Sequence, residues 1–190
     1  MLKFYKYVFF FAAICWLLAI LVHIGSIAGF DVGDKVPFIW LLHLGIFIVW
    51  IPTILSIRNN EEVAAYQKQE VKRPLGIFKI IFKRTPIWLT IISVLGFYYA
   101  VANFFLFAIS QQGSVGFING QRALHNHGRI IKILSEQEYH HYQANEIRGF
   151  SGHWIAFYGI ATAVLFSFIK KGRTGESPNM QDNVPNWHGA

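Results

Sequence analysis

Histidine supplies most of the chemistry that this sequence could perform, with eight imidazoles in 190 residues. His23 and His43 each lie inside an uncharged apolar run, at equal distances from Gly33 in the turn between the two runs. If both runs are helices that leave this turn together, the two imidazoles lie at nearly the same depth, roughly one to two helical turns below the surface. Asn103, in a later apolar run, reaches a similar depth from the opposite direction.

A pair of neutral imidazoles on facing helices can bind a haem iron or supply part of a copper or zinc site. We therefore take His23, His43 and Asn103 as a candidate cofactor site, with haem b or a transition metal (Zn or Cu) as the candidate cofactor. In the alternative interpretation, each imidazole hydrogen-bonds a carbonyl or hydroxyl group across the bundle, as buried polar groups must. Depth can be read from the sequence, but the direction of a ring around its helix axis cannot, so both interpretations stay open.

A second group of histidines lies in the longest polar segment, residues 111–149, and directly after it. The candidate metal ligands of this group are His125, His127, His141 and His153. His125 and His127 share a face only if the chain is extended there. His140 is adjacent to His141, so on a helix their side chains point about 100° apart and do not easily join one site. The alternative for each residue is a surface histidine without a ligand, since a metal site needs several ligands to converge.

Nucleophilic catalysis has little support from the sequence. Ser151 and His153 are close in the chain, but neighbours in one helix cannot form a serine–histidine pair oriented by a third group. Ser151 is better interpreted as the N-cap of the last apolar run. The sequence contains no phosphate-binding loop, dinucleotide fingerprint or Cys-x-x-Cys motif. An enzyme is therefore the less favoured interpretation.

Four uncharged apolar runs must position these side chains, and they cover residues 7–30, 37–57, 86–110 and 150–169. As α-helices with about 1.5 Å per residue, runs of this length cross a hydrocarbon core of about 30 Å. The composition agrees, because only 14% of the residues are charged, whereas soluble domains average about 25%. The sequence therefore predicts an all-α integral membrane protein with four transmembrane helices in two antiparallel hairpins.

The basic residues predict which side of the membrane each segment faces. Twelve of the 17 Lys and Arg lie in the N-terminus, the loop 58–85 and the C-terminal tail. Basic residues in short loops stay on the cytoplasmic side. We therefore expect both termini and the loop 58–85 to be cytoplasmic, in a plasma (inner) membrane, with residues 111–149 on the outer side. Trp40 and Trp154 then fall at the outer ends of their helices, as interfacial anchors do.

The polar segment 111–149 is predicted to form a small ordered cap on the outer side. Asn126-His127-Gly128 is a turn signal between two short apolar strips, which predicts a β-hairpin over residues 121–134. Ser135 and Glu138 have the spacing of a capping box. A short helix is therefore expected over residues 136–148, with Gly149 ending it.

The expected domains are a transmembrane bundle over residues 1–172, which includes the loop 58–85 and the cap 111–149, and a disordered cytoplasmic tail over residues 173–190. Stripes of small residues on the third and fourth runs favour close helix packing, either within the bundle or between copies of the chain. Nucleic acid is not an expected partner, because the basic residues lie beside apolar runs and form no separate basic face.

The sequence favours a non-catalytic function: a subunit of a larger membrane complex, or a homo-oligomeric binding module, whose histidine-rich outer face binds a ligand or partner. The expected partners are membrane lipid and further copies of the chain or other subunits. The alternative is a membrane redox protein that binds haem or a metal through His23 and His43.

Overall fold

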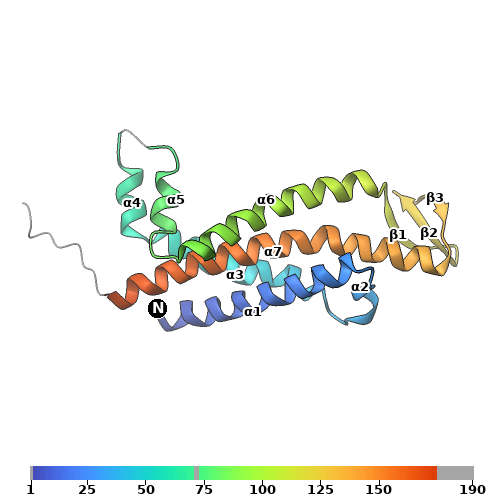
Figure 1. The fold of residues 1–190 in the computed structure, drawn as a ribbon, viewed down its shortest axis with the longest axis horizontal. Coiled ribbons are helices and arrows are strands. Elements are labelled where there is room, and N and C mark those ends of the chain that lie inside the picture. The colour runs from blue at the N-terminus through green and yellow to red at the C-terminus, as the bar shows by residue number, and fades with distance from the viewer. Residues whose placement is uncertain (1, 71–72, 175–190) are drawn as a thin grey trace, which may run out of the picture.

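The computed structural model describes residues 2–70 and 73–174. Within these ranges, four helices are long and apolar enough to cross a membrane. They are α1 (Leu2–Ile27), α3 (Leu41–Arg58), α6 (Ile87–Ser110) and α7 (Glu136–Thr174), and they form an elongated bundle (Figure 1). The prediction of four such helices is confirmed. The predicted tail 173–190 lies outside the described residues, apart from the end of α7.

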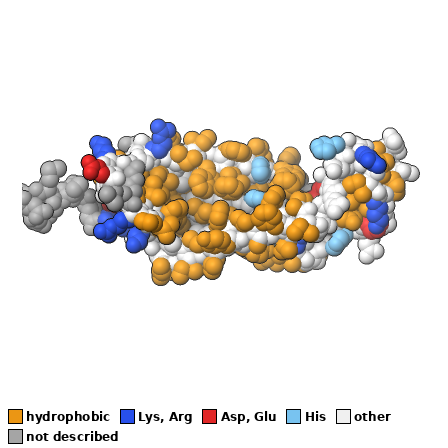
Figure 2. All heavy atoms as spheres, turned by 90° about the horizontal axis from the view of Figure 1, so that it is seen from above, with side chains coloured by type: hydrophobic (Ala, Val, Ile, Leu, Met, Phe, Trp, Pro, Cys, Tyr) orange, Lys and Arg blue, Asp and Glu red, His pale blue; other side chains and the backbone are white. Residues whose placement is uncertain are grey.

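Helix α7 is the centre of the bundle, and α1, α3 and α6 all pack along it. Trp154, Tyr158 and Leu165 on α7 are fully buried. The other three helices expose apolar side chains along much of their length, and on the face shown in Figure 2 these gather over the middle of the bundle. An apolar belt of this kind suits a lipid environment, whereas a soluble monomer rarely exposes so large a patch.

Small and polar residues allow α6 to approach α7 closely. The Ser93 hydroxyl donates to the carbonyl of Gly159 at 2.9 Å, and the Asn103 amide donates to the carbonyl of Arg148 at 2.9 Å. A Cβ atom added at Gly152 would lie 2.6 Å from Nδ2 of Asn103. The small-residue stripes of the third and fourth apolar runs therefore meet inside the bundle.

Helix α7 is one unbroken helix of 39 residues, where the sequence predicted two separate helices. The prediction that one helix ends at Gly149 and that Ser151 caps the next is wrong. Gly149 lies against the ring of Phe107, where an added Cβ would come within 2.6 Å of a ring carbon. Ser151 donates its hydroxyl to the carbonyl of Arg148 at 3.2 Å, within the same helix. The predicted cap helix and fourth span are thus one element.

A three-stranded antiparallel sheet covers one end of the bundle, in the order β1 (Ser114–Ile118), β2 (Gln121–Asn126) and β3 (Arg129–Ile133). Strands β2 and β3 confirm the predicted hairpin. His127 and Gly128 join them with φ values of 48° and 82°, which is the left-handed backbone of a two-residue hairpin turn. Strand β1 was not predicted. We call this end of the bundle the cap end.

The capping box at the start of α7 is confirmed. The backbone N–H of Ser135 donates to the Glu138 carboxylate at 2.9 Å, and the backbone N–H of Glu138 donates to the Ser135 hydroxyl at 3.3 Å. The cap end also carries α2 (Val32–Lys35), a single turn between α1 and α3.

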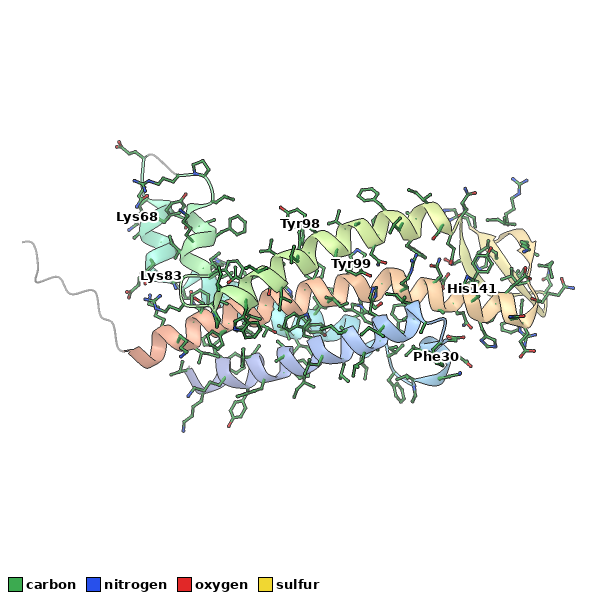
Figure 3. All side chains as sticks on the ribbon, viewed as in Figure 1. Phe30, Lys68, Lys83, Tyr98, Tyr99 and His141 are labelled. Carbon is green, nitrogen blue, oxygen red and sulfur yellow. The ribbon has the colours of Figure 1, made fainter. Side chains whose placement is uncertain are left out.

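The opposite end, which we call the loop end, holds α4 (Glu61–Gln67) and α5 (Gly76–Ile81) between α3 and α6. Lys68 and Lys83 lie here, as does the start of α1 (Figures 1 and 3). The Glu62 carboxylate is 3.7 Å from the Lys83 ammonium, 3.1 Å from the Arg84 guanidinium and 3.8 Å from the Lys171 ammonium. One acid therefore ties α4 to the connection between α5 and α6 and to the end of α7.

Replacing Glu62 by glutamine is expected to loosen α4 from the bundle. Burial alone would raise the pKa of the Glu62 carboxyl, but the hydrogen bond from Arg84 and the charges of Arg84, Lys83 and Lys171 lower it below its ordinary value of 4.5. Its stabilisation is therefore present above the unfolded pKa and is lost as pH falls through the folded pKa. For a half-exposed ion cluster we expect about 1 kcal/mol, or roughly a fivefold loss of amide exchange protection in α4 at pH 7.

Protection factors from hydrogen exchange measure this effect, and Glu61→Gln, one residue away, is the matched control. The difference between Glu62→Gln and the parent should disappear when both are measured well below pH 4. Equal protection of α4 in Glu62→Gln and Glu61→Gln at pH 7 would contradict the assigned role of the ion cluster.

Candidate functional site

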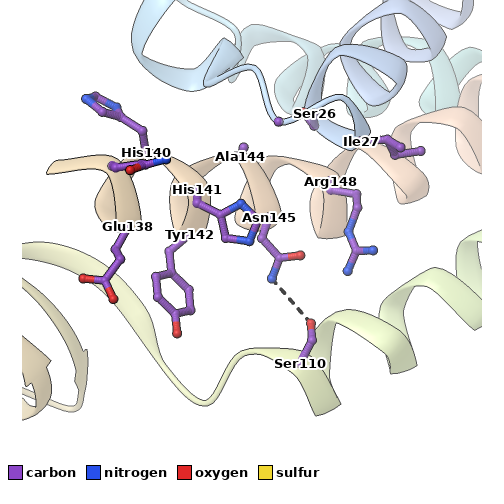
Figure 4. Close-up of a pocket in the computed structure, with 12 residues that line it drawn as sticks. Ser26, Ile27, Ser110, Glu138, His140, His141, Tyr142, Ala144, Asn145 and Arg148 are labelled. Carbon is purple, nitrogen blue, oxygen red and sulfur yellow. Dashed lines mark hydrogen bonds between the residues drawn. The ribbon is translucent and has the colours of Figure 1, made fainter. Parts of the chain in front are cut away.

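A groove of about 940 Å³ opens at the cap end, along α7 and between the ends of α1 and α6 (Figure 4). Most of its lining belongs to α7, and the rest comes from the ends of the two neighbouring helices. The lining residues are Ser26, Ile27, Gly29, Ser110, Gln137, Glu138, His140, His141, Tyr142, Ala144, Asn145 and Arg148.

One face of α7 brings four polar groups into this groove. Glu138, His141, Asn145 and Arg148 follow one another at spacings of three, four and three residues, so their side chains lie on the same side of the helix. From the cap inward, the groove therefore presents a carboxylate, an imidazole, an amide and a guanidinium group in order.

Arg148 places a positive charge at the inner end of the groove, where Figure 4 shows its side chain extending beneath Ile27. Its Nε atom is buried and has no hydrogen-bond partner among the residues that the structure describes. A buried N–H without a partner costs about 1–3 kcal/mol. An anionic group in the groove could accept from the guanidinium group, and one that reached Nε would supply the missing acceptor.

Two other polar groups of the groove, Glu138 and Asn145, already have partners. The Glu138 carboxylate accepts from the Lys132 ammonium at 2.6 Å, and from Ser135 as described above. The Asn145 amide donates to Oε1 of Gln111 at 2.8 Å and to the Ser110 hydroxyl at 3.4 Å, which joins α7 to the end of α6. The acid of the groove is thus neutralised by its own neighbours, and the charge of Arg148 is left to act on a ligand.

His23 lies just below the groove and is 3% exposed. Its Nδ1 atom is 2.7 Å from the Ser151 hydroxyl, and its Nε2 atom is 2.6 Å from the Tyr99 hydroxyl. One imidazole therefore connects α1, α6 and α7. Both ring nitrogens have partners, so an iron or other metal ion at His23 would have to displace one of them.

The contact between Ser151 and His23 is a serine–histidine pair on two different helices, which the sequence did not reveal. Tyr99 on the far side of the imidazole completes a chain of three groups, the pattern that nucleophilic catalysis requires. However, the Ser151 side chain is fully buried and does not line the groove. In this structure the chain of three groups holds helices together and does not face a substrate.

His43 and His23 contact different side chains, whereas Asn103 donates to the same carbonyl, that of Arg148, as Ser151, the partner of His23. His43 is exposed on α3, and its Nδ1 atom accepts a hydrogen bond of 3.2 Å from the Trp154 indole. Asn103 donates to backbone carbonyls of α7. Trp154 itself is 0% exposed, so its prediction as an interfacial anchor is wrong, because the indole packs and hydrogen-bonds inside the bundle. A cofactor shared by His23 and His43 stays a prediction.

The four predicted metal ligands lie in four different settings. His125 is half-buried on β2, and its Nδ1 atom has no hydrogen-bond partner within the described ranges. His127 is exposed in the hairpin turn, and His141 is exposed in the groove. His153 donates from Nδ1 to the carbonyl of Gly149 at 3.2 Å.

Within residues 2–70 and 73–174, the group of three side chains close enough to hold a metal ion is Asp31, Asp34 and His140. None of the four predicted ligands belongs to it. The Asp31 carboxylate is 2.7 Å from Nδ1 of His140 and also accepts from the backbone N–H of Asp34 at 3.1 Å. Asp31 is therefore used to cap α2 and to hold the α1–α2 connection against α7.

Comparisons with protein families, curated proteins and solved structures found no match for this chain. The function must therefore be inferred from the contacts of the site.

Arg148 and the groove are the features that sequence reasoning missed. The spacing of the four polar residues on α7 was a usable signal, since it marks one helical face. The sequence could not show that the ends of α1 and α6 flank this face and turn it into a groove.

Proposed function

We propose that this chain is a non-catalytic binding module in a membrane, and that the groove at its cap end binds a ligand with an anionic group. The observation that carries this proposal is the guanidinium of Arg148 at the inner end of the groove, whose buried Nε atom has no hydrogen-bond partner in the part of the chain that the structure describes. A guanidinium group forms paired, charge-assisted hydrogen bonds with carboxylate or phosphate oxygens. His141 and Asn145 lie further along the same helix face and would contact the rest of the ligand.

The membrane setting is supported by the four long apolar helices and by their exposed apolar surface. The basic residues Lys68 and Lys83 lie at the loop end, opposite the groove (Figure 3). By the positive-inside rule, both termini are then cytoplasmic and the groove faces the outer side of an inner membrane. In this role the chain acts as a homo-oligomer or as a subunit of a larger membrane complex.

Arg148→Gln is expected to abolish the response of the protein to anionic ligands. Hydrogen bonds to a charged group are worth about 1.5–3 kcal/mol, which corresponds to a loss of affinity of roughly 10- to 100-fold. We would measure melting temperatures of the purified full chain with inorganic phosphate, succinate and phosphatidic acid. At least one of these anions should stabilise the parent and leave Arg148→Gln unchanged.

Arg122→Gln is the matched control, because Arg122 lies on β2 away from the groove and is 3.4 Å from the Glu136 carboxylate. It should respond to anions as the parent does. An equal response of Arg148→Gln and Arg122→Gln, or no response of the parent to any of the anions, would refute the proposed function.

A further inference from the structure

The inner end of the groove lies at the depth where the apolar helices end. Arg148 is three residues before Ser151, which contacts His23 inside α1. Ile27 and Ser110, the last residues of α1 and α6, line the same groove. If α1 and α6 span a membrane, the guanidinium of Arg148 therefore lies at the level of the lipid headgroups.

Between α1 and α6, the groove is bordered by two helices that meet at few points. Helices α1 and α6 both pack on α7 but make little contact with each other. Ile27 at the edge of the groove is 57% exposed, and Tyr99, which reaches across to His23, is 44% exposed. A molecule that left the groove between α1 and α6 would pass over an isoleucine and an aromatic ring.

The groove suits an amphiphile because its polar face borders an exposed apolar side chain. Glu138, His141, Asn145 and Arg148 form the polar face on α7, and the exposed Ile27 of α1 lies at the edge of the groove. A volume of about 940 Å³ is near the upper end for small-molecule pockets and far exceeds the needs of a single phosphate ion. A free inorganic anion would use only the guanidinium and would leave the apolar exit without a role.

We infer that the ligand is a lipid whose phosphate or carboxylate headgroup contacts Arg148 and whose hydrocarbon chain leaves the groove between α1 and α6. This inference rests on the proposed function, since it names the class of ligand that the same groove takes. Polar substituents of the headgroup would extend outward along α7 toward His141, and the chain would pass Ile27 toward Tyr99.

The test compares each lipid with its own headgroup. Native mass spectrometry of the full chain would measure binding of phosphatidic acid, with phosphatidylcholine as the lipid that lacks a net charge. Calorimetry would measure glycerol 3-phosphate, and the pair oleate and butyrate repeats the comparison for a carboxylate. We expect an anionic lipid to bind at least 10-fold more tightly to the parent than to Arg148→Gln, and at least 100-fold more tightly than its water-soluble partner.

Two further variants keep the test decisive. Arg148→Lys keeps the charge and should retain part of the affinity for the lipid, which separates loss of binding from loss of folding. Ile27→Asn places a polar group at the exit, and it should weaken binding of the lipid by a larger factor than any binding of the soluble headgroup.

The other outcomes overturn the inference in distinguishable ways. If glycerol 3-phosphate or butyrate binds as tightly as its lipid and depends on Arg148, the proposed function stands and the lipid is excluded. If lipids bind without regard to Arg148 or to headgroup charge, they are annular lipids only, and the inference fails. If no anion binds in either form, both the inference and the proposed function fail.

Discussion

Gly149→Ala is expected to destabilise the folded protein even though alanine is the better helix former. An added Cβ would lie 2.6 Å and 2.8 Å from ring carbons of Phe107 on α6, so the ring or the whole helix must move. Overpacking of this kind costs about 1–3 kcal/mol. For a chain of this size, a net loss of about 2 kcal/mol corresponds to a melting temperature lower by roughly 4–8 °C.

Gly96→Ala tests the same substitution in the same pair of helices. There, the added Cβ meets Ile155 at 3.7 Å, which is an ordinary contact. The gain in helix propensity, about 1 kcal/mol in a soluble helix, is then unopposed. Thermal unfolding in one detergent should therefore rank Gly96→Ala at or above the parent and Gly149→Ala below it. The reverse ranking would show that α6 and α7 do not approach as described.

His23→Leu is expected to give the second large effect, because one imidazole connects three helices. Its removal takes a partner from the buried Ser151 hydroxyl and from the Tyr99 hydroxyl, with distances of 2.7 Å and 2.6 Å in the parent. The loss of partners for buried polar groups costs about 1–3 kcal/mol. Tyr99→Phe removes one of the two contacts and should cost less.

A double-mutant cycle with His23→Leu and Tyr99→Phe measures their interaction directly. Because the two side chains share a hydrogen bond, the double variant should lose less stability than the two single variants added together, with a coupling of about 0.5–3 kcal/mol. Tyr98→Phe is the control, since Tyr98 is adjacent to Tyr99, is 67% exposed and points outward from the bundle (Figure 3). If the losses of stability in the two single variants simply add up in the double variant, His23 and Tyr99 do not interact, and the role of His23 in connecting the helices is contradicted.

Much of the architecture could be predicted because its signals are local. Each membrane-length helix corresponds to an uncharged apolar run, and the hairpin turn at His127-Gly128 needs only two residues with positive φ. The capping box likewise joins residues three positions apart, Ser135 and Glu138. Signals of this kind are complete within a few neighbouring residues, so no knowledge of tertiary packing is needed to read them.

The wrong or missing predictions concern glycines that make room for a residue far away in the sequence. Gly149 has the local appearance of a helix end, but its lack of a side chain makes room for Phe107. Gly116 weakened the signal for strand β1. Its place in the strand is explained by His125, since an added Cβ would lie 3.0 Å from Nε2 of that ring. In both cases the partner is on another element, which a window of sequence does not contain.

The sequence predicts the depth of a histidine along its helix but not the direction in which its side chain points. His23 and His43 were compared by their distance from one turn, yet His23 is buried among three helices and His43 is exposed on α3. Whether a side chain is buried or exposed depends on its direction around the helix axis. The number of residues between a histidine and the turn does not reveal this direction. Arg148 was overlooked for a related reason, because its importance depends on where α1 and α6 end.

The unbroken course of α7 has a mechanical consequence. At about 1.5 Å per residue, its 39 residues form a rod of about 58 Å, almost twice the thickness of a hydrocarbon core. Arg148 in the groove and Lys171 beside Glu62 are fixed to this one rod. Because the helix is unbroken between them, a tilt or rotation imposed at the cap end is carried to the loop end.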